Sequence, residues 1–379
     1  MSPIPLLFLH VSGRNLVRDY NSRISNSEDD LNSTLDFIDH FVDFKSTKID
    51  ENHIKIDEDH NKIDIEEDFT DFDNLKDLLE HKNILEKNSR FRRFLSINQL
   101  VRSENCASFL QFARYENAES QVKKILKSAR FCKHRFCAMC QYRKSRKVSL
   151  ETISRIEQMR DQVRGLRALM ITLTVPNCAI KDLNATVKNM SKAVKLFFKR
   201  KEIQKVCLGY VRALELFGDH TKAGEAHPHY HILFLVRHSY FDSREYLTQK
   251  DFSKLWTDCY KSPVNLVVDV RKIKAKKVKV NDEKSVELDA FTSSILEVCK
   301  YSLKASSISA QSDDDIKELL KQTSHIRSYA ISESILQYEP KLEELDLSVW
   351  HYVCDEYFRY NKKEQVYNYL RSEINLDQQ

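Results

Sequence analysis

The stretch that most constrains the fold is one in which three histidines alternate with other residues. The three histidines are His227, His229 and His231, and an apolar run to Val236 follows directly. Alternation that leads into such a run predicts a strand entering a buried sheet. Since alternate side chains of a strand share a face, we expect the three imidazoles in one row. Histidine is a common metal ligand, so the row predicts a divalent-metal site, with a merely polar strand edge as the alternative.

A carboxylate is expected beside this row. Residues 207–217 predict another strand, which contains Glu215 among apolar residues, and a short loop joins it to the histidine strand. Two strands of one hairpin share a face, so Glu215 is the candidate third ligand of the metal. The alternative is a surface charge on an edge strand.

A second group of reactive side chains falls within residues 290–304, which contain neither Gly nor Pro and predict a helix. Glu297, Tyr301 and Lys304 lie four and three residues apart, so one continuous helix would present them on one face. A carboxylate, a phenol and an ammonium beside a metal form a candidate catalytic group. The pattern elsewhere predicts strands at 169–175 and 264–271 and helices at 182–203 and 246–260.

Four of the nine cysteines gather in one part of the chain and predict a structural zinc site. They are Cys106, Cys132, Cys137 and Cys140, and two residues separate the last pair. Thiolates in such a turn bind Zn²⁺ tetrahedrally. Cys106 is distant in sequence, so His134 is an alternative fourth ligand. The alternative is that the four cysteines are buried free thiols and bind no zinc.

The charge of the chain is divided unevenly along its length. Residues 21–90 hold 20 Asp and Glu against 9 Lys and Arg, whereas residues 91–379 hold 35 against 50. A basic body indicates a nucleic-acid partner, because phosphate neutralisation supplies most non-specific affinity, although a solvated basic surface is the alternative. The candidate DNA-binding side chains are Arg143, Lys144, Arg146, Lys147, Lys272, Lys274, Lys276 and Lys277.

These observations predict four parts of the chain. Residues 1–90 are expected to form an acidic, partly disordered extension, and 91–150 a cysteine-rich, basic zinc-knuckle module. Residues 151–305 are expected to form the catalytic core, and 306–379 a helical C-terminal region. No apolar run approaches the ~18 residues of a membrane span, so we expect a cytoplasmic protein without membrane contact.

Three motifs in this order resemble those of rolling-circle plasmid replication initiators, within the HUH endonuclease superfamily. The motifs are Ile171–Asn177, His227–Leu233 and Glu297–Lys304. The knuckle from Phe131 to Arg143 and the Glu four residues before the tyrosine are similar to the branch with one catalytic tyrosine. The resemblance spans roughly residues 100–305, and neither the acidic segment nor the last seventy residues clearly belong to it.

The resemblance implies an α+β fold with a central antiparallel sheet of about five strands and helices on one side, similar to an RNA-recognition motif. It also implies an endonuclease that nicks one strand of origin DNA, exposed in a hairpin loop. Tyr301 would form a 5′-phosphotyrosyl link that permits rejoining and termination, with Mg²⁺ or Mn²⁺ held by His229, His231 and either His227 or Glu215. Lys304 would offset the negative charge of the transition state or lower the pKa of the phenol. Glu297 would activate the water that releases the enzyme.

Other interpretations share part of these features. A transposase or relaxase of the same superfamily would use the same strand and tyrosine on another target. A metal-dependent hydrolase that uses activated water would need no tyrosine. A non-catalytic zinc DNA-binding protein would account for the cysteines and the charge, but it would leave the histidine row unexplained. The resemblance to initiators leaves open a homodimer and partnership with a host helicase and polymerase.

Overall fold

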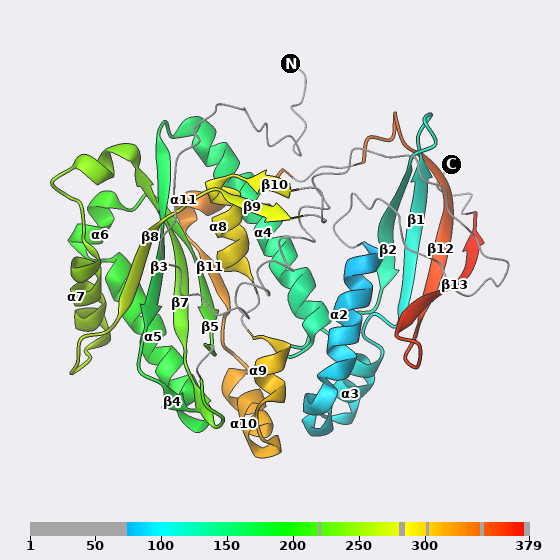
Figure 1. Ribbon diagram of the computed structural model, residues 1–379, viewed down its shortest axis with the longest axis horizontal. Helices are drawn as coiled ribbons and strands as arrows, with labels where there is room; N and C mark the ends of the chain where they lie inside the picture. The colour runs from blue at the N-terminus through cyan, green and yellow to red at the C-terminus, as the bar shows by residue number, and fades with distance from the viewer. Residues whose placement is uncertain (1–73, 219–220, 280–284, 301–302, 342–344, 375–379) are drawn as a thin grey trace.

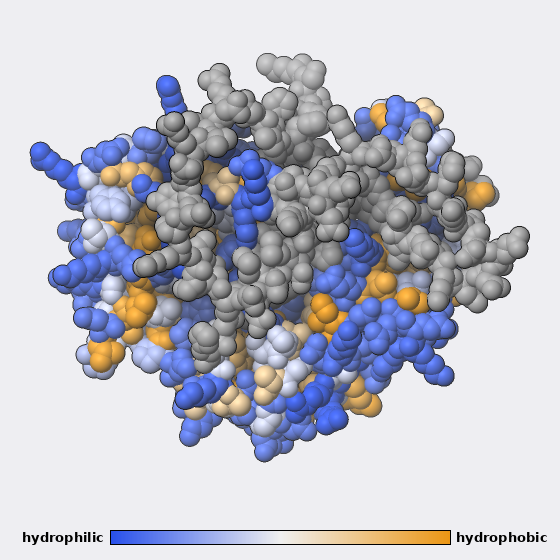
Figure 2. All heavy atoms as spheres, viewed as in Figure 1, coloured by the Kyte–Doolittle hydropathy of each residue, from blue (hydrophilic) through white to orange (hydrophobic). Residues whose placement is uncertain are grey.

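The computed structural model describes residues 74–218, 221–279, 285–300, 303–341 and 345–374 (Figure 1). The acidic segment up to residue 73 and Tyr301 therefore lie outside the described residues. No helix within these ranges is long and apolar enough to cross a membrane. On the face drawn in Figure 2, the described residues are mostly hydrophilic, and hydrophobic side chains gather in small separate groups.

A five-stranded antiparallel sheet forms the centre of the larger part of the molecule. Its strands lie in the order β11-β5-β7-β3-β8, and each neighbouring pair is antiparallel. The bounds are β3 Leu166–Thr174, β5 Gly209–Glu215, β7 His229–Arg237, β8 Val268–Lys272 and β11 Tyr329–Ile331. The α+β class and the predicted central sheet are thus confirmed.

Helices cover both faces of this sheet, so the expectation of helices on one side was wrong. One face packs on α5 (Leu183–Phe198), α6 (Lys201–Val206) and α7 (Gln249–Tyr260). The opposite face packs on α8 (Ala290–Cys299) and α4 (Ala138–Gln162). The reason lies in β7, where Ile232 and Phe234 pack with the first group of helices and Leu233 and Leu235 with the second. A strand that is apolar on both faces needs cover on both.

A second antiparallel sheet joins the cysteine-rich region to the C-terminal region. It has the strand order β13-β12-β1-β2. The bounds are β1 Phe109–Glu116, β2 Val122–Ala129, β12 His351–Asn361 and β13 Val366–Glu373. Aromatic side chains stabilise the contact between distant segments, as where Phe112 packs edge-on against Phe358 with 5.8 Å between ring centroids.

The C-terminal region was therefore predicted wrongly as helical throughout. The helices α9 (Ala305–Ser309), α10 (Asp313–Thr323) and α11 (Glu333–Leu336) agree with that prediction, but residues 351–373 form two strands. β12 pairs with β1, so the cysteine-rich and C-terminal regions share one sheet across the expected domain boundaries.

Folded structure begins well before the expected boundary at residue 90. The helix α2 (Leu75–Lys87) packs on α4, followed by η1 (Ser89–Phe94) and α3 (Ile97–Glu104). The remaining short elements are β4 Cys178–Ala179, η2 Ile180–Asp182, β6 Glu225–Ala226, η3 His238–Asp242, β9 Lys276–Lys279 and β10 Ser285–Leu288. β9 and β10 pair as a two-stranded ribbon, and β9 follows directly on the lysine-rich run that begins at Lys272.

Candidate metal centre and zinc cluster

Strand register brings three candidate metal ligands together on the α8 face of the central sheet. Glu215 is the last residue of β5 and lies opposite His229 of β7, while Ala213 lies opposite His231. Glu215 and His229 are both 7% exposed. β5 lies inside the sheet between β11 and β7, so the interpretation of Glu215 as an exposed charge on an edge strand is excluded.

The distances between the ligand atoms suit a single divalent cation. The Nε2 atoms of His229 and His231 are 3.1 Å apart, and the oxygens of Glu215 lie 3.6 Å and 3.4 Å from these two nitrogens. Metal–ligand distances near 2.1 Å in an octahedral site place neighbouring ligand atoms about 3.0 Å apart. Glu215 Oε1 is buried without a hydrogen-bond partner among the described residues. Two imidazoles and a carboxylate with an unsatisfied buried oxygen fit Mn²⁺ or Mg²⁺.

Hydrogen bonds from neighbouring groups orient both imidazoles. His229 Nδ1 lies 2.8 Å from the carbonyl oxygen of His227, which can only accept, so Nδ1 carries the proton. The Nε2 atom of His229 is then free to bind a cation. His231 Nδ1 lies 3.2 Å from the hydroxyl of Thr172, its partner across the β3–β7 register. Such outer contacts fix ring orientation at metal sites.

His227 lies beside this group but is not one of the three clustered ligands. It precedes β7, and its ring centroid is 5.1 Å from that of His229. Its Nδ1 is 2.7 Å from the side-chain oxygen Oδ1 of Asn177, and the amide nitrogen Nδ2 of Asn177 donates to Glu225 at 3.1 Å. The geometry therefore favours Glu215 over His227 as the third ligand.

The charges of the cluster reinforce one another. Burial alone would raise the pKa of Glu215, but Lys300 and the two imidazoles lower it well below its ordinary value. Burial alone would lower the pKa of His229, but the Glu215 carboxylate outweighs burial and raises it. The carboxylate of Glu215 is therefore ionised where a cation would bind.

Lys300 was missed by the sequence analysis. Its Nζ lies 3.8 Å from Glu215 Oε1 and 3.7 Å from Glu297 Oε1, and the residue is buried. Lys300 thereby links Glu297 of α8 to Glu215 of the candidate metal centre. Tyr301, the next residue after Lys300, lies outside the described residues. The signal for Lys300 was its place between Glu297 and Tyr301 in the third motif.

The predicted continuous helix that would carry Glu297, Tyr301 and Lys304 was wrong. α8 ends at Cys299, Lys300 has an extended ψ of 174°, and Lys304 caps the start of α9. The hydroxyl of Tyr329 lies 2.9 Å from the carbonyl oxygen of Cys299 and 2.8 Å from that of Lys300. This distant hydroxyl satisfies carbonyl groups that the helix end leaves open, so the chain can turn there.

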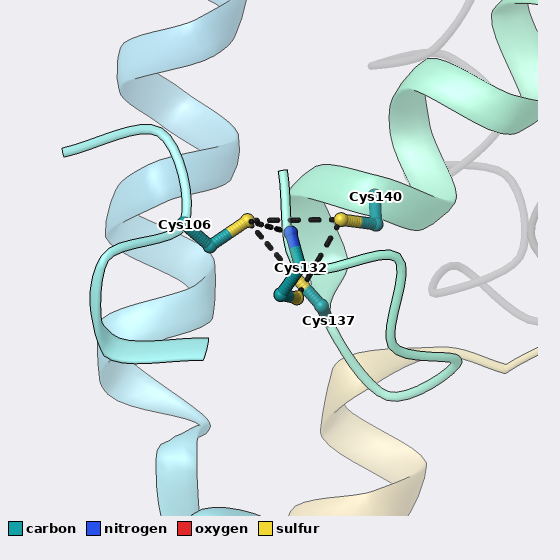
Figure 3. Close-up of side chains that lie close together, drawn as sticks. All are labelled: Cys106, Cys132, Cys137 and Cys140. Atoms are coloured by element: carbon teal, nitrogen blue, oxygen red, sulfur yellow. Dashed lines mark hydrogen bonds between the residues drawn. The ribbon is translucent and has the colours of Figure 1, made fainter. Parts of the chain in front are cut away.

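The four candidate zinc ligands converge from three segments of the chain. Figure 3 shows the sulfur atoms of Cys106, Cys132, Cys137 and Cys140 pointing towards one another. Cys106 lies 3.6 Å from both Cys137 and Cys140, and Cys132 lies 3.6 Å from Cys140. Zinc–sulfur bonds of about 2.3 Å in a tetrahedron place the sulfurs about 3.8 Å apart, so the cluster fits Zn²⁺.

Backbone geometry prepares this cluster for a cation. Lys133 adopts a left-handed φ of 59° directly after Cys132, and its amide donates to Cys140 Sγ at 3.2 Å. The amide of Cys132 donates to Cys106 Sγ at 3.4 Å. Contact with the other sulfurs lowers the pKa of Cys132 and raises that of Cys137. Close packing of thiols thus stabilises one thiolate, and four thiolates together would require a cation.

Cys106 rather than His134 belongs to the cluster. His134 Nδ1 accepts the amide hydrogen of Phe136 at 3.1 Å, and its ring stacks on Phe91 with 5.1 Å between centroids. His134 lies outside the group of sulfurs within mutual reach. Cys106 is distant in sequence, but the loop before β1 places it beside the knuckle.

The candidate DNA-binding residues divide into exposed and buried ones. Arg146 was assigned wrongly, since it is 1% exposed and its Nη1 lies 2.7 Å from Asp77 Oδ2. Tyr142 donates to the same carboxylate. The others have side chains that reach the surface at least in part, namely Arg143, Lys144, Lys147, Lys272, Lys274, Lys276 and Lys277. Their contact with DNA remains a prediction.

Comparison with known proteins gives a consistent family. A family profile described as Replication protein matches residues 123–373. Protein rep of Streptococcus pneumoniae is 33% identical over 179 residues, which cover 46% of this chain and 54% of that relative. Protein rep of Staphylococcus aureus is 31% identical over 216 residues, which cover 57% of this chain and 86% of that relative. No solved structure matches.

The match spans about half the length of the Streptococcus relative and most of the Staphylococcus relative. The range matched by the family profile includes Glu215, His229 and His231 and all the cluster cysteines except Cys106. The chain therefore belongs to the Replication protein family, which confirms the resemblance to plasmid replication initiators.

Proposed function

We propose that this protein initiates rolling-circle replication of a plasmid by nicking one DNA strand at the origin with Tyr301 as the nucleophile. The observation that carries the proposal is the buried cluster of Glu215, His229 and His231 in a chain of the Replication protein family. Two imidazoles and a buried carboxylate are suited to holding a cation against a phosphate.

Cleavage of a phosphodiester requires its negative charge to be offset and a nucleophile to be aligned. Glu215, His229 and His231 would hold a divalent cation, which would supply Lewis-acid polarisation to a bound phosphate. The phenolate oxygen of Tyr301 would attack phosphorus, and the bond to the 3′ oxygen would break. The products are a 5′-phosphotyrosyl link and a free 3′-hydroxyl, which takes up a proton and can prime synthesis.

Neighbouring side chains have separate roles in this proposal. Lys300 is one residue from Tyr301 and reaches Glu215, so it fixes the carboxylate and adds positive charge beside the phosphate. Lys304, at the start of α9, would stabilise the phenolate or the transition state. Glu297 reaches Lys300 from α8 and would activate the water that resolves the covalent link at termination.

The test is incubation with labelled single-stranded oligonucleotides from the plasmid origin in the presence of Mn²⁺. A denaturing gel separates the protein–DNA adduct, and peptide mapping locates it. We expect an adduct at Tyr301 that Tyr301→Phe abolishes while DNA binding is retained. The exposed Tyr246 provides the matched control, since Tyr246→Phe should nick normally.

Glu297→Ala separates the two halves of the reaction. We expect it to nick and then accumulate the covalent adduct, whereas the exposed control Glu202→Ala should release DNA normally. Cleavage without an adduct would favour a metal-dependent hydrolase. Binding without cleavage would favour a non-catalytic DNA-binding protein.

A further inference from the structure

A cavity of about 1190 Å³ lies apart from the three clustered metal ligands, on the zinc-cluster side of the molecule. Its walls come from α3, the cysteine knuckle, the first half of α4 and α10, whose positions can be followed in Figure 1. We call this cavity the knuckle groove. It is too large for a single ion and has the size of a groove for an extended ligand.

The knuckle groove has cationic side chains and no carboxylate among its lining residues, and Glu151 outside the lining lies 3.8 Å from Lys147. Seven cationic side chains contribute, namely Arg102, Arg130, Lys133, Arg135, Arg143, Lys144 and Lys147. The ligand that this lining recognises must therefore carry several negative charges along its length. A nucleic-acid backbone has this property.

Arg135 offers a donor that no described residue satisfies. Its Nη2 donates to the carbonyl oxygen of Ile326, but its Nη1 is buried without a hydrogen-bond partner among the described residues. A phosphate bound in the groove would supply the missing acceptor.

Aromatic rings lie among the cationic side chains that line the groove. The guanidinium of Arg143 lies 3.7 Å from the ring centroid of Phe131, and Phe94 and Phe136 also line the cavity. Rings and stacked guanidinium planes provide platforms for unpaired bases, whereas the bases of a duplex are stacked on one another. The combination favours single-stranded DNA over duplex DNA.

The groove leads towards the metal centre. Ser328 lines the groove, and its carbonyl oxygen accepts the amide of Leu214 at 2.8 Å, one residue before Glu215. The next residue, Tyr329, lies near Lys144 on the groove side and reaches the end of α8 with its hydroxyl. Residues 328–329 therefore lie between the groove and the strand that ends at Glu215.

We propose that the knuckle groove binds the single-stranded DNA that flanks the cleaved phosphodiester and so delivers that strand to the metal centre. Phosphates contact the row of cations, and bases stack on Phe131 and its neighbours. The delivery of the strand to the nick site rests on the proposed function, whereas binding in the groove does not require cleavage.

The test measures binding of a fluorescent oligothymidylate to the full chain by anisotropy, without divalent cations, over a range of salt concentrations. The variant is Arg130→Gln with Lys144→Gln, both on the groove surface. Each lost phosphate contact should reduce the slope of log affinity against log salt by about 0.7 for single strands, so the double variant should lose about 1.4. We expect a loss of affinity of roughly tenfold or more at 0.1 M salt.

A matched control carries the same loss of charge elsewhere. Lys192 on α5 and Lys250 on α7 are exposed and outside the groove, so Lys192→Gln with Lys250→Gln should leave the salt slope nearly unchanged. Circular dichroism and zinc content verify that each variant is folded. Arg102→Gln, at a different wall of the groove, provides a second and independent variant.

The outcomes separate the alternatives. Equal slopes for groove and control variants would overturn the proposal, as would a loss confined to a duplex of the same length. A rise in the DNA affinity of the groove variants would also overturn the proposal, because it would indicate that the groove holds the acidic segment of the same chain. Normal groove binding with no nicking by the wild-type protein would count against the proposed function alone.

Discussion

Glu215 on β5 lies directly opposite His229 on β7, and 3.6 Å separates the carboxylate oxygen Oε2 from the imidazole Nε2. Both side chains are buried, and both belong to strands inside the central sheet. The hydrogen-bonded ladder therefore sets their separation, and neither residue depends on a loop for its position. A metal site built in this way is rigid before the cation arrives.

Glu215→Gln tests this relationship, because it preserves shape and removes the negative charge. We expect Mn²⁺ affinity to fall by tenfold or more, roughly the loss seen when groups at metal sites are altered. Titration of Mn²⁺ by calorimetry or by electron paramagnetic resonance measures the change. The exposed Glu202→Gln on α6 is the control. Unchanged affinity in Glu215→Gln would show that the cation, if bound, uses other ligands.

The cysteine cluster predicts one structural zinc ion for each chain. Cys137→Ser should lose the zinc, because Cys137 is a buried member of the four-cysteine cluster. It should also lower the thermal midpoint, since metal binding and folding are coupled in such modules. Elemental analysis and a thermal melt measure both effects. Cys178→Ser alters a half-buried cysteine outside the cluster and should retain zinc, and zinc retained by Cys137→Ser would contradict the assignment.

The lowered pKa of Glu86 leads us to expect that the folded protein loses stability in acid. Burial would raise its pKa, but Arg92 and Lys82 outweigh burial and lower it from 4.5 to about 2. A lowered pKa stabilises the folded state above the unfolded value of 4.5, and this contribution disappears as the pH falls towards 2. Since solvent partly screens the group, we expect Glu86→Gln to cost about 2 kcal/mol at pH 7.

Urea unfolding at pH 7 and at pH 3 measures this contribution of Glu86. The difference between wild type and Glu86→Gln should shrink at pH 3, because below pH 4.5 the unfolded chain takes up a proton on Glu86 while the folded chain keeps it ionised down to about pH 2. Glu364→Gln in the exposed β12–β13 hairpin is the control and should change little at either pH. A difference that stays constant with pH would show that Glu86 acts through packing alone.

Local patterns predicted the clustering of Glu215, His229 and His231 because the geometry of the cluster is local. Period-two alternation identified His229 and His231, and the short connection between β5 and β7 brought Glu215 beside them. The end of α8 could not be predicted in this way. The hydroxyl of Tyr329, about thirty residues further along the chain, contacts the carbonyl oxygen of Cys299 there, and the next residue, Lys300, faces Glu215.

The second sheet was missed for a related reason. β1 is paired with β12, and Phe112 lies opposite Glu356, so its partner is more than two hundred residues away. The alternating burial that such pairing creates in residues 351–373 is weak, because much of β13 is exposed. Long-range pairing overrides local propensity at strands of this kind.

Arg146 illustrates how a basic run can mislead and leads to the last prediction. Its neighbours Arg143, Lys144 and Lys147 line the knuckle groove, whereas Arg146 is buried against Asp77 of α2. Arg146→Met should therefore leave the salt slope of DNA binding unchanged. It should lower the free energy of unfolding by about 3 kcal/mol, because it leaves the buried carboxylate of Asp77 without its cation.

Two measurements on the Arg146→Met variant distinguish a structural role from DNA contact. Urea unfolding gives the loss of stability, and oligothymidylate binding at several salt concentrations gives the slope. The double variant Asp77→Asn with Arg146→Met should recover part of the lost stability, because it removes the uncompensated charge. A reduced salt slope in the folded Arg146→Met protein would instead place this side chain on the DNA.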